Sequence, residues 1–165
     1  MSGICGIIQC TKCHTNLQDA LNKLHSWNSP YGKSSSDILI DNNLYLGCHL
    51  EHITNSPLLE TPIIVLNNTI ATIDAIIYNR NELLHKLNLD SSISDEELLL
   101  KFITTYGVES LKEINGDFTG AIYNTQNNTI TLFRDHMGIR PLYYHINETT
   151  LSFSTDMRGL LSCSH

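Results

Sequence analysis

Met1-Ser2-Gly3-Ile4-Cys5-Gly6-Ile7-Ile8 opens the chain with a small residue after the initiator Met, followed by glycines and aliphatic residues. The pattern predicts a short, fully buried strand. The glycines leave room for another strand or a substrate close to the backbone. If Met1 is removed, the new terminus carries a free amine beside the Ser2 hydroxyl, which is the arrangement that N-terminal nucleophiles use.

The composition indicates one globular domain over residues 1–165, long enough for a single core. Lys and Arg number 10 and Asp and Glu number 17, a net charge of −7 that argues against a nucleic-acid partner and an anionic membrane surface. No apolar run reaches the length of a membrane span, and the start lacks the basic region of a signal peptide. We therefore expect a cytoplasmic protein.

The cysteines are too few and too unevenly placed for a disulfide scaffold. Cys10-Thr11-Lys12-Cys13-His14 matches a haem-attachment pattern, but without an export signal a loop with thiols is favoured. The histidines show no ligand spacing such as His-x-x-x-His. The sequence therefore predicts no bound metal and no cofactor.

Helices and hairpins follow along the chain. A helix is expected over 15–27, where one apolar stripe is formed by Leu17, Ala20, Leu21 and Leu24. Residues 33–36 are predicted as polar loop and 51–61 as irregular. Further helices are expected over 79–87, 95–105, 108–114 and from 156. Strands are expected over 38–40, 44–50, 63–66, 69–77, 117–124, 129–134, 142–146 and 151–154.

Many antiparallel hairpins, with helices gathered in the middle of the chain, predict an α+β fold in which helices cover the sheets. We also expect Trp27 to pack the first helix. Arg134 and Asp135 are expected to form a buried pair that fixes the turn before Gly138.

Three passages carry a family pattern: Asn115–Tyr123 (NGDFTGAIY), Phe133–Tyr144 (FRDHMGIRPLYY) and Leu151–Leu161 (LSFSTDMRGLL). In this order and spacing they resemble the glutaminase domain of asparagine-synthetase-like enzymes. These are class II glutamine amidotransferases of the N-terminal nucleophile (Ntn) hydrolase superfamily. The resemblance runs from Ser2 to Leu161. It implies a four-layer αββα sandwich of two mostly antiparallel sheets.

The resemblance also implies a chemistry. In the family an N-terminal Cys attacks the amide of glutamine, its α-amine shuttles the proton, and the ammonia travels to a synthetase domain. The family's nucleophile falls on Ser2, and its oxyanion-hole Asn-Gly pair falls on Asp74 and Ala75. The Arg that grips the glutamine carboxylate falls on His49. The Asp that binds the glutamine α-amine is kept as Asp95.

The substitutions weaken that chemistry. Asp74 would face the developing oxyanion as a like charge, and loss of one oxyanion donor typically costs about 10²–10³ in rate. His49 lacks the bidentate fork of Arg. The Ser2 hydroxyl is a poorer nucleophile than a thiol. The sequence therefore predicts a domain that keeps the scaffold and has lost the glutaminase activity.

Two other functions remain open at this point. One is an active hydrolase, either a glutaminase that uses Cys5 after cleavage behind Ile4 or an amidase that uses Ser2. The other is a non-catalytic domain that binds glutamine or a related small molecule in the old pocket.

The pyrophosphate-binding Ser-Gly-Gly-x-Asp-Ser loop of the synthetase half does not occur in the sequence. We therefore expect a domain separated from its C-terminal ATP-pyrophosphatase part, or a stand-alone subunit. The expected partner is an ATP-dependent amide-forming synthetase of the asparagine-synthetase, β-lactam-synthetase or lasso-cyclase type. Whether the domain forms a homodimer is left open.

Overall fold

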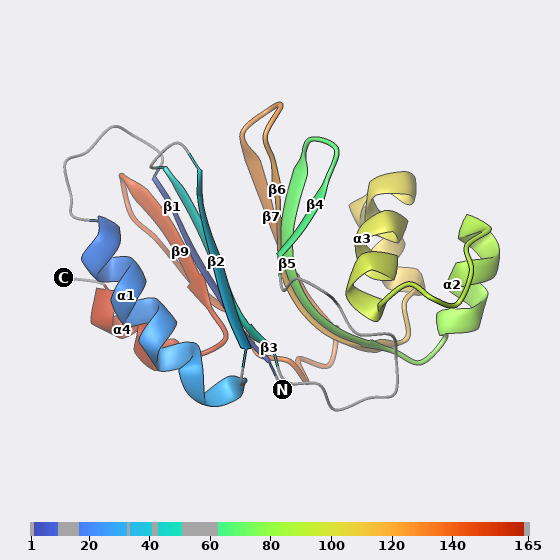
Figure 1. The fold of residues 1–165 in the computed structure, drawn as a ribbon, viewed down its shortest axis with the longest axis horizontal. Helices are drawn as coiled ribbons and strands as arrows, with labels where there is room; N and C mark the ends of the chain where they lie inside the picture. The colour runs from blue at the N-terminus through green and yellow to red at the C-terminus, as the bar shows by residue number, and fades with distance from the viewer. Residues whose placement is uncertain (1, 10–16, 33, 41–42, 51–62, 164–165) are drawn as a thin grey trace.

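The computed structural model describes residues 2–9, 17–32, 34–40, 43–50 and 63–163. Two antiparallel sheets face each other, and helices cover the outer face of each sheet (Figure 1). The predicted α+β class and the αββα order of layers are confirmed. The predictions for 10–14 and 51–61 lie outside the described residues.

The first sheet has five strands in the order β2-β3-β1-β9-β8. Their bounds are β1 Gly3–Gln9, β2 Ser34–Ile40, β3 Leu44–Leu50, β8 Tyr143–Ile146 and β9 Thr150–Ser154. The opening stretch of the sequence is thus the central strand. Gly6 is required there, because a Cβ atom would lie 2.4 Å from the Phe153 ring and 2.6 Å from the Tyr45 carbonyl oxygen.

The second sheet has four strands in the order β4-β5-β6-β7. Their bounds are β4 Ile63–Leu66, β5 Thr69–Ile77, β6 Gly116–Asn124 and β7 Thr129–Arg134. β4 pairs with residues 69–72 of β5, whereas β6 pairs with all of 69–77. Residues 73–77 of β5 are therefore paired with β6 on one side only, and their other edge faces the helices.

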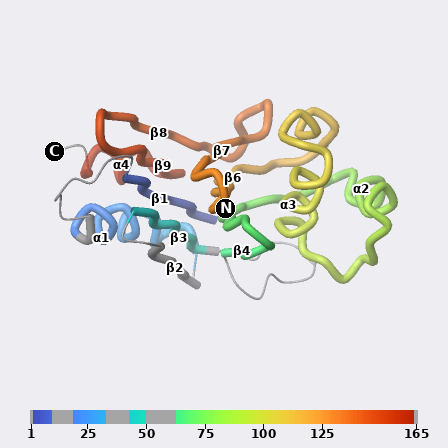
Figure 2. The backbone as a smooth tube through the Cα atoms, turned by 90° about the horizontal axis from the view of Figure 1, so that it is seen from above, coloured from blue at the N-terminus to red at the C-terminus, as the bar shows by residue number. Residues whose placement is uncertain are grey.

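Helices α1 (Leu17–Asn28) and α4 (Met157–Cys163) cover the five-stranded sheet. Helix α3 (Asp95–Tyr106) covers the four-stranded sheet, and α2 (Arg80–Leu87) packs beside α3. The two helical layers therefore lie at opposite ends of the molecule (Figure 2). Two 3-10 turns, Ser29–Tyr31 and Val108–Glu113, follow α1 and α3. Ser94 caps the start of α3, because its hydroxyl accepts the Glu97 N–H at 3.2 Å.

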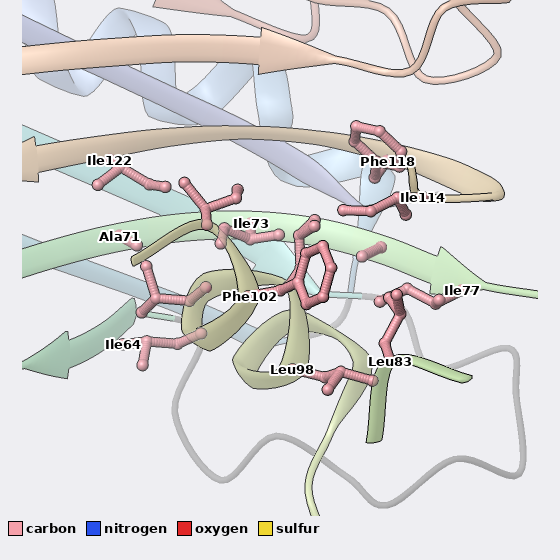
Figure 3. Close-up of a cluster of buried hydrophobic side chains, with 14 of the residues drawn as sticks. Ile64, Ala71, Ile73, Ile77, Leu83, Leu98, Phe102, Ile114, Phe118 and Ile122 are labelled. Carbon is pink, nitrogen blue, oxygen red and sulfur yellow. The ribbon is translucent and has the colours of Figure 1, made fainter. Parts of the chain in front are cut away.

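Three layers of apolar side chains hold the sandwich together. Under α3, the side chains of Phe102, Ile73 and Phe118 meet in the largest of them (Figure 3). Between the sheets lie Leu46, Phe153, Ile70 and Ala121, among others. Because side chains alternate along a strand, Ile4 points between the sheets while Cys5 and Ile7 pack against α1.

One local prediction was wrong. Ser34–Ser36 belongs to β2, because the ladder to β3 continues as far as the Ser34–Leu50 pair and backbone pairing at a sheet edge outweighs the polar composition.

Trp27 lies near the end of α1, beside α4. It is 38% exposed, and the Arg158 guanidinium of α4 lies 4.9 Å from the centre of its ring. The Trp27 indole is thus partly covered by a cation from the neighbouring helix.

Candidate functional site

Ser2, Asp74 and Arg140 meet where the start of β1 reaches the middle of β5, between the two sheets. The Ser2 N–H donates to Asp74 Oδ2 at 3.1 Å, and Arg140 Nη1 forms an ion pair with the same oxygen. The three residues are only 2, 4 and 6% exposed. The carboxylate at the oxyanion-hole position is thus held by a cation and by the backbone of the nucleophile position.

Arg140 reaches Asp74 because Asp135 fixes the loop after β7. The Asp135 carboxylate accepts the N–H groups of Ile139 at 2.9 Å and Arg140 at 3.0 Å. Burial acts to raise the Asp135 pKa, but these backbone donors outweigh it and the pKa is lowered. Arg140 Nε then donates to the Asp117 carbonyl oxygen at 3.0 Å. Burial lowers the pKa of Arg140 to about 10, so its guanidinium stays a cation at neutral pH.

This arrangement corrects one prediction. Arg134 is exposed while Asp135 is 2% exposed, so the two do not form the expected buried pair. Asp135 fixes the turn through backbone N–H groups instead. The buried Arg–Asp pair in this part of the chain is Arg140 with Asp74.

The Ala75 N–H lies on the open edge of β5, near the start of α3. Backbone amides alternate along a strand, and two residues further on the Ile77 N–H donates to Asp95 Oδ2 at 3.0 Å. On the same edge the Ala75 N–H lies near the Glu96 carboxyl and acts to lower its pKa. Burial is the main cause of the net rise in the Glu96 pKa, and Asp95 adds to it. Of the two residues on which the family's oxyanion-hole pair falls, one is thus an acid, Asp74, and the other, Ala75, has an acid near its N–H.

Asp95 has partners of its own within the chain. One carboxylate oxygen accepts the Ile77 N–H, and the other forms an ion pair with Arg80. Arg80 also donates to the Ser91 carbonyl oxygen at 3.2 Å and to that of Ile93. The Asp95 side chain thus ties the start of α3 to β5 and α2.

His49 stands opposite Gly3 on β3 and contacts α1. Its ring centroid is 4.1 Å from that of His25, and its Nε2 lies 3.1 Å from the His25 carbonyl oxygen. Burial is the main cause that lowers the His49 pKa, followed by the neighbouring His25. His49 is therefore a neutral ring on the helix-facing side of the sheet, whereas Asp74 lies between the sheets.

Cys5 is completely buried and packs with Leu21 and Leu24 of α1. Its side chain is on the helix-facing side of β1, the opposite side from Ile4. The structure therefore does not bring Cys5 together with Asp74 and Ala75.

Asn28 holds the start of β1 from the helix side. Its Nδ2 donates to Ser154 Oγ at 3.0 Å, and its Oδ1 accepts the Thr155 hydroxyl at 2.9 Å. A Cβ atom on Gly3 would lie 3.0 Å from the Asn28 carbonyl oxygen. β1 is thus fixed on one face by Asn28 and on the other by Asp74.

Sequence reasoning missed Arg140 and Glu96 as parts of the site. A signal for Arg140 existed, because a buried carboxylate at Asp74 requires a cation and Arg140 lies in the family motif. Glu96 follows Asp95 directly, but which amide its carboxylate meets depends on how α3 docks.

A surface cavity of about 550 Å³ lies apart from this site, at the edge strands β7 and β8. It is lined by Leu132, Phe133, Arg134, Leu142, Tyr143 and Tyr144. None of the predicted site residues lines it. Within the described ranges, no three His, Cys, Asp or Glu side chains are grouped in a way that could hold a metal ion. No helix in the described part of the chain is long and apolar enough to cross a membrane.

Comparison with known proteins agrees with the fold. The model of the glutamine amidotransferase domain family matches residues 1–165, and the chain belongs to this family. The solved structure of glutamine phosphoribosylpyrophosphate (PRPP) amidotransferase from B. subtilis superimposes with a TM-score of 0.66 over 96% of this chain and 42% of that one. At 15% identity it supports the Ntn-hydrolase-type fold alone.

Several curated relatives are named as asparagine synthetases. Putative asparagine synthetase [glutamine-hydrolyzing] 2 of Methanocaldococcus jannaschii is 33% identical over 87 residues, which are 52% of this chain and 17% of that protein. Asparagine synthetase [glutamine-hydrolyzing] 2 of Bacillus subtilis is 30% identical over 98 residues, 58% of this chain and 13% of the relative. The match thus spans less than a fifth of either relative.

Proposed function

We propose that this chain is a glutamine amidotransferase domain without glutaminase activity, and that it acts as the scaffold or partner of an ATP-dependent amide-forming synthetase. The observation that carries the proposal is the Asp74 carboxylate, buried at the oxyanion-hole position and paired with Arg140. An amide side chain at this position would donate a hydrogen bond to the oxyanion, whereas a carboxylate only accepts.

The second donor supports the same conclusion. The Glu96 carboxyl lies near the Ala75 N–H, so an oxyanion that approached this donor would meet a second acid. Each lost oxyanion donor typically costs about 10²–10³ in rate. With both donors affected and a hydroxyl at Ser2, the site lacks the electrostatic stabilisation that amide hydrolysis needs.

The partner is inferred from the relatives. They are named as glutamine-hydrolysing asparagine synthetases, and the matched part is a small share of each. A domain of this kind would supply packing surface to a synthetase part that obtains its amine from another source.

The first test measures ammonia release from glutamine by protein that begins at Ser2. We expect no release above the level of the Ser2→Ala variant, which serves as the matched control. Release that Ser2→Ala abolishes would show a Ser2 amidase, and release that Cys5→Ala abolishes would show a Cys5 glutaminase. Either result would overturn the proposal.

A second test concerns the scaffold role. The domain replaces the corresponding part of a glutamine-hydrolysing asparagine synthetase, and product formation is measured with ammonium salt or with glutamine. We expect product with ammonium and none with glutamine. An insoluble chimera, or one inactive with ammonium, would count against a scaffold that fits such a synthetase.

A further inference from the structure

We propose that removal of Met1 completes a buried, charge-balanced cluster in which the Ser2 α-ammonium, Asp74, Arg140 and Asp135 hold the N-terminus in place. The inference rests on the proposed function and explains why the terminal amine does not serve as a catalytic base. In this cluster the amine is a structural cation.

The Ser2 nitrogen lies beside the Asp74 carboxylate. It lies 3.1 Å from Asp74 Oδ2, and Ser2 is 2% exposed. With Met1 attached, this nitrogen is an amide that donates one hydrogen bond. After Met1 is removed, the same atom carries a full positive charge at the same carboxylate. A charge-assisted hydrogen bond is roughly twice as strong as a neutral one.

The buried side chains around the Ser2 nitrogen carry an excess of negative charge. Asp74 and Asp135 are buried carboxylates, and Arg140 contacts both, through its guanidinium and through its backbone N–H. These three side chains sum to one negative charge. Buried charges are costly unless they are matched. An α-ammonium at Ser2 supplies the missing positive charge and brings the sum to zero.

Ionisable groups on the neighbouring elements lie outside this cluster. On α3, Asp95 is matched by Arg80, and Glu96, whose pKa is raised by burial, lies near the Ala75 N–H at the edge of β5. On β6, the Asp117 carboxylate is only partly buried, so solvent screens its charge, and it accepts the Tyr78 hydroxyl at 2.6 Å. On β3, burial keeps His49 neutral by lowering its pKa, and the His25 ring beside it belongs to α1.

A charged Ser2 amine cannot act as a catalytic base. A terminal amine acts as base for its own hydroxyl only when the amine is neutral. Asp74 favours the charged form, because an opposite charge within hydrogen-bond distance stabilises the protonated amine. The Ser2 amine therefore cannot take up the Ser2 hydroxyl proton at neutral pH.

The test compares two proteins that differ only at the terminus. Cleavage of a removable N-terminal fusion gives one chain that starts at Met1 and one that starts at Ser2. At pH 7 we expect the Ser2 chain to melt about 3 °C or more above the Met1 chain, a shift that roughly 1 kcal/mol produces in a domain of this size. The difference should vanish in Asp74→Asn and persist in Glu109→Gln, which removes an exposed acid elsewhere.

A direct readout follows the amine itself. In protein labelled with ¹⁵N at Ser2, the amine signal should titrate above the ordinary α-amine value of about 8. In Asp74→Asn the titration should return to or below that value. If Asp74→Asn does not fold, the double variant Asp74→Asn/Arg140→Met leaves no unpaired guanidinium and takes its place.

Equal melting temperatures of the two chains, or an amine that titrates at its ordinary value, would overturn the inference. These outcomes are independent of the ammonia-release assay. Glutamine hydrolysis would refute the proposed function while the two melting curves still decide the role of the amine.

Discussion

Arg140 and Asp74 form a buried ion pair that joins the loop after β7 to the middle of β5. Their side chains are 8 and 5% exposed, so the pair is shielded from the water that weakens surface ion pairs. The same carboxylate oxygen accepts the Ser2 N–H from the other sheet. One acidic side chain thus connects β5, the loop and the start of β1.

Replacement of Arg140 by Met should be strongly destabilising, because Asp74 would remain buried without its cation. Loss of one partner of a buried pair costs about 3–5 kcal/mol. The double variant Asp74→Leu/Arg140→Met should recover most of the loss in urea unfolding. Lys112→Met, which removes the exposed partner of Glu109, should change the free energy of unfolding by less than about 1 kcal/mol. A single Arg140→Met variant as stable as the native protein would contradict the prediction.

Replacement of Glu96 by Gln should change how stability depends on pH. Burial raises the folded-state pKa of Glu96, so the stability that this group contributes is complete below its unfolded pKa and is lost as the pH rises through the folded value. We therefore expect urea unfolding to give Glu96→Gln a higher free energy of unfolding, relative to the native protein, at pH 8 than at pH 4.5. Parallel pH profiles for the two proteins would be inconsistent with a buried Glu96 carboxylate.

His49 should cause part of the loss of stability that occurs as the pH falls below neutral. Burial lowers its folded-state pKa, so its contribution is present above the unfolded value of about 6.5 and is lost as the pH falls further. His49→Gln should flatten the decline in melting temperature between pH 7 and pH 5. His85→Gln, on the exposed face of α2, is the matched control and should leave the decline unchanged. An identical decline in both variants would argue against a neutral His49.

Ser2→Cys alone should not create a glutaminase. A thiol restores the nucleophile, but Asp74 and Glu96 still face the positions of the oxyanion donors. Ammonia release from glutamine should therefore stay at the level of Ser2→Ala. Ammonia release clearly above that level would mean that the two acids do not block the site.

Cys5 and Cys48 should resist thiol reagents in the native protein. Both are completely buried, and burial raises the pKa of Cys48 to about 12. Peptide mapping after iodoacetamide treatment should show both unmodified in buffer and modified in urea. The half-buried Cys163 should react faster than either. Rapid native modification of Cys5 would revive it as a candidate nucleophile.

Much of the fold could be predicted from hydrophobic patterning. The strands over 44–50, 63–66, 69–77 and 129–134 have the predicted bounds, and the helix cap at Ser94 was readable from the acids that follow it. Ser34–Ser36 could not be assigned to a strand, because its pairing with β3 is a tertiary effect.

The site was only partly predictable. The changed residues at Ser2, Asp74 and Ala75 could be recognised from the family motif, because they are local features of sequence. The Asp74–Arg140 pair spans 66 residues and forms only when the loop after β7 folds back over β6 and β5. The orientation of His49 was equally inaccessible, since a shift of one residue in strand register turns a side chain to the opposite face.

The Asp74–Arg140 pair has an evolutionary consequence. Under the proposed function, a change toward glutaminase chemistry that began with Asp74→Asn would leave the Arg140 guanidinium buried without its counter-ion, and one that began at Arg140 would leave Asp74 buried without its cation. Each first step lowers the stability of the whole domain before any catalysis is gained. The ion pair therefore opposes stepwise change at this site, because a substitution at either residue is better tolerated when both change together, and the two codons lie 66 positions apart.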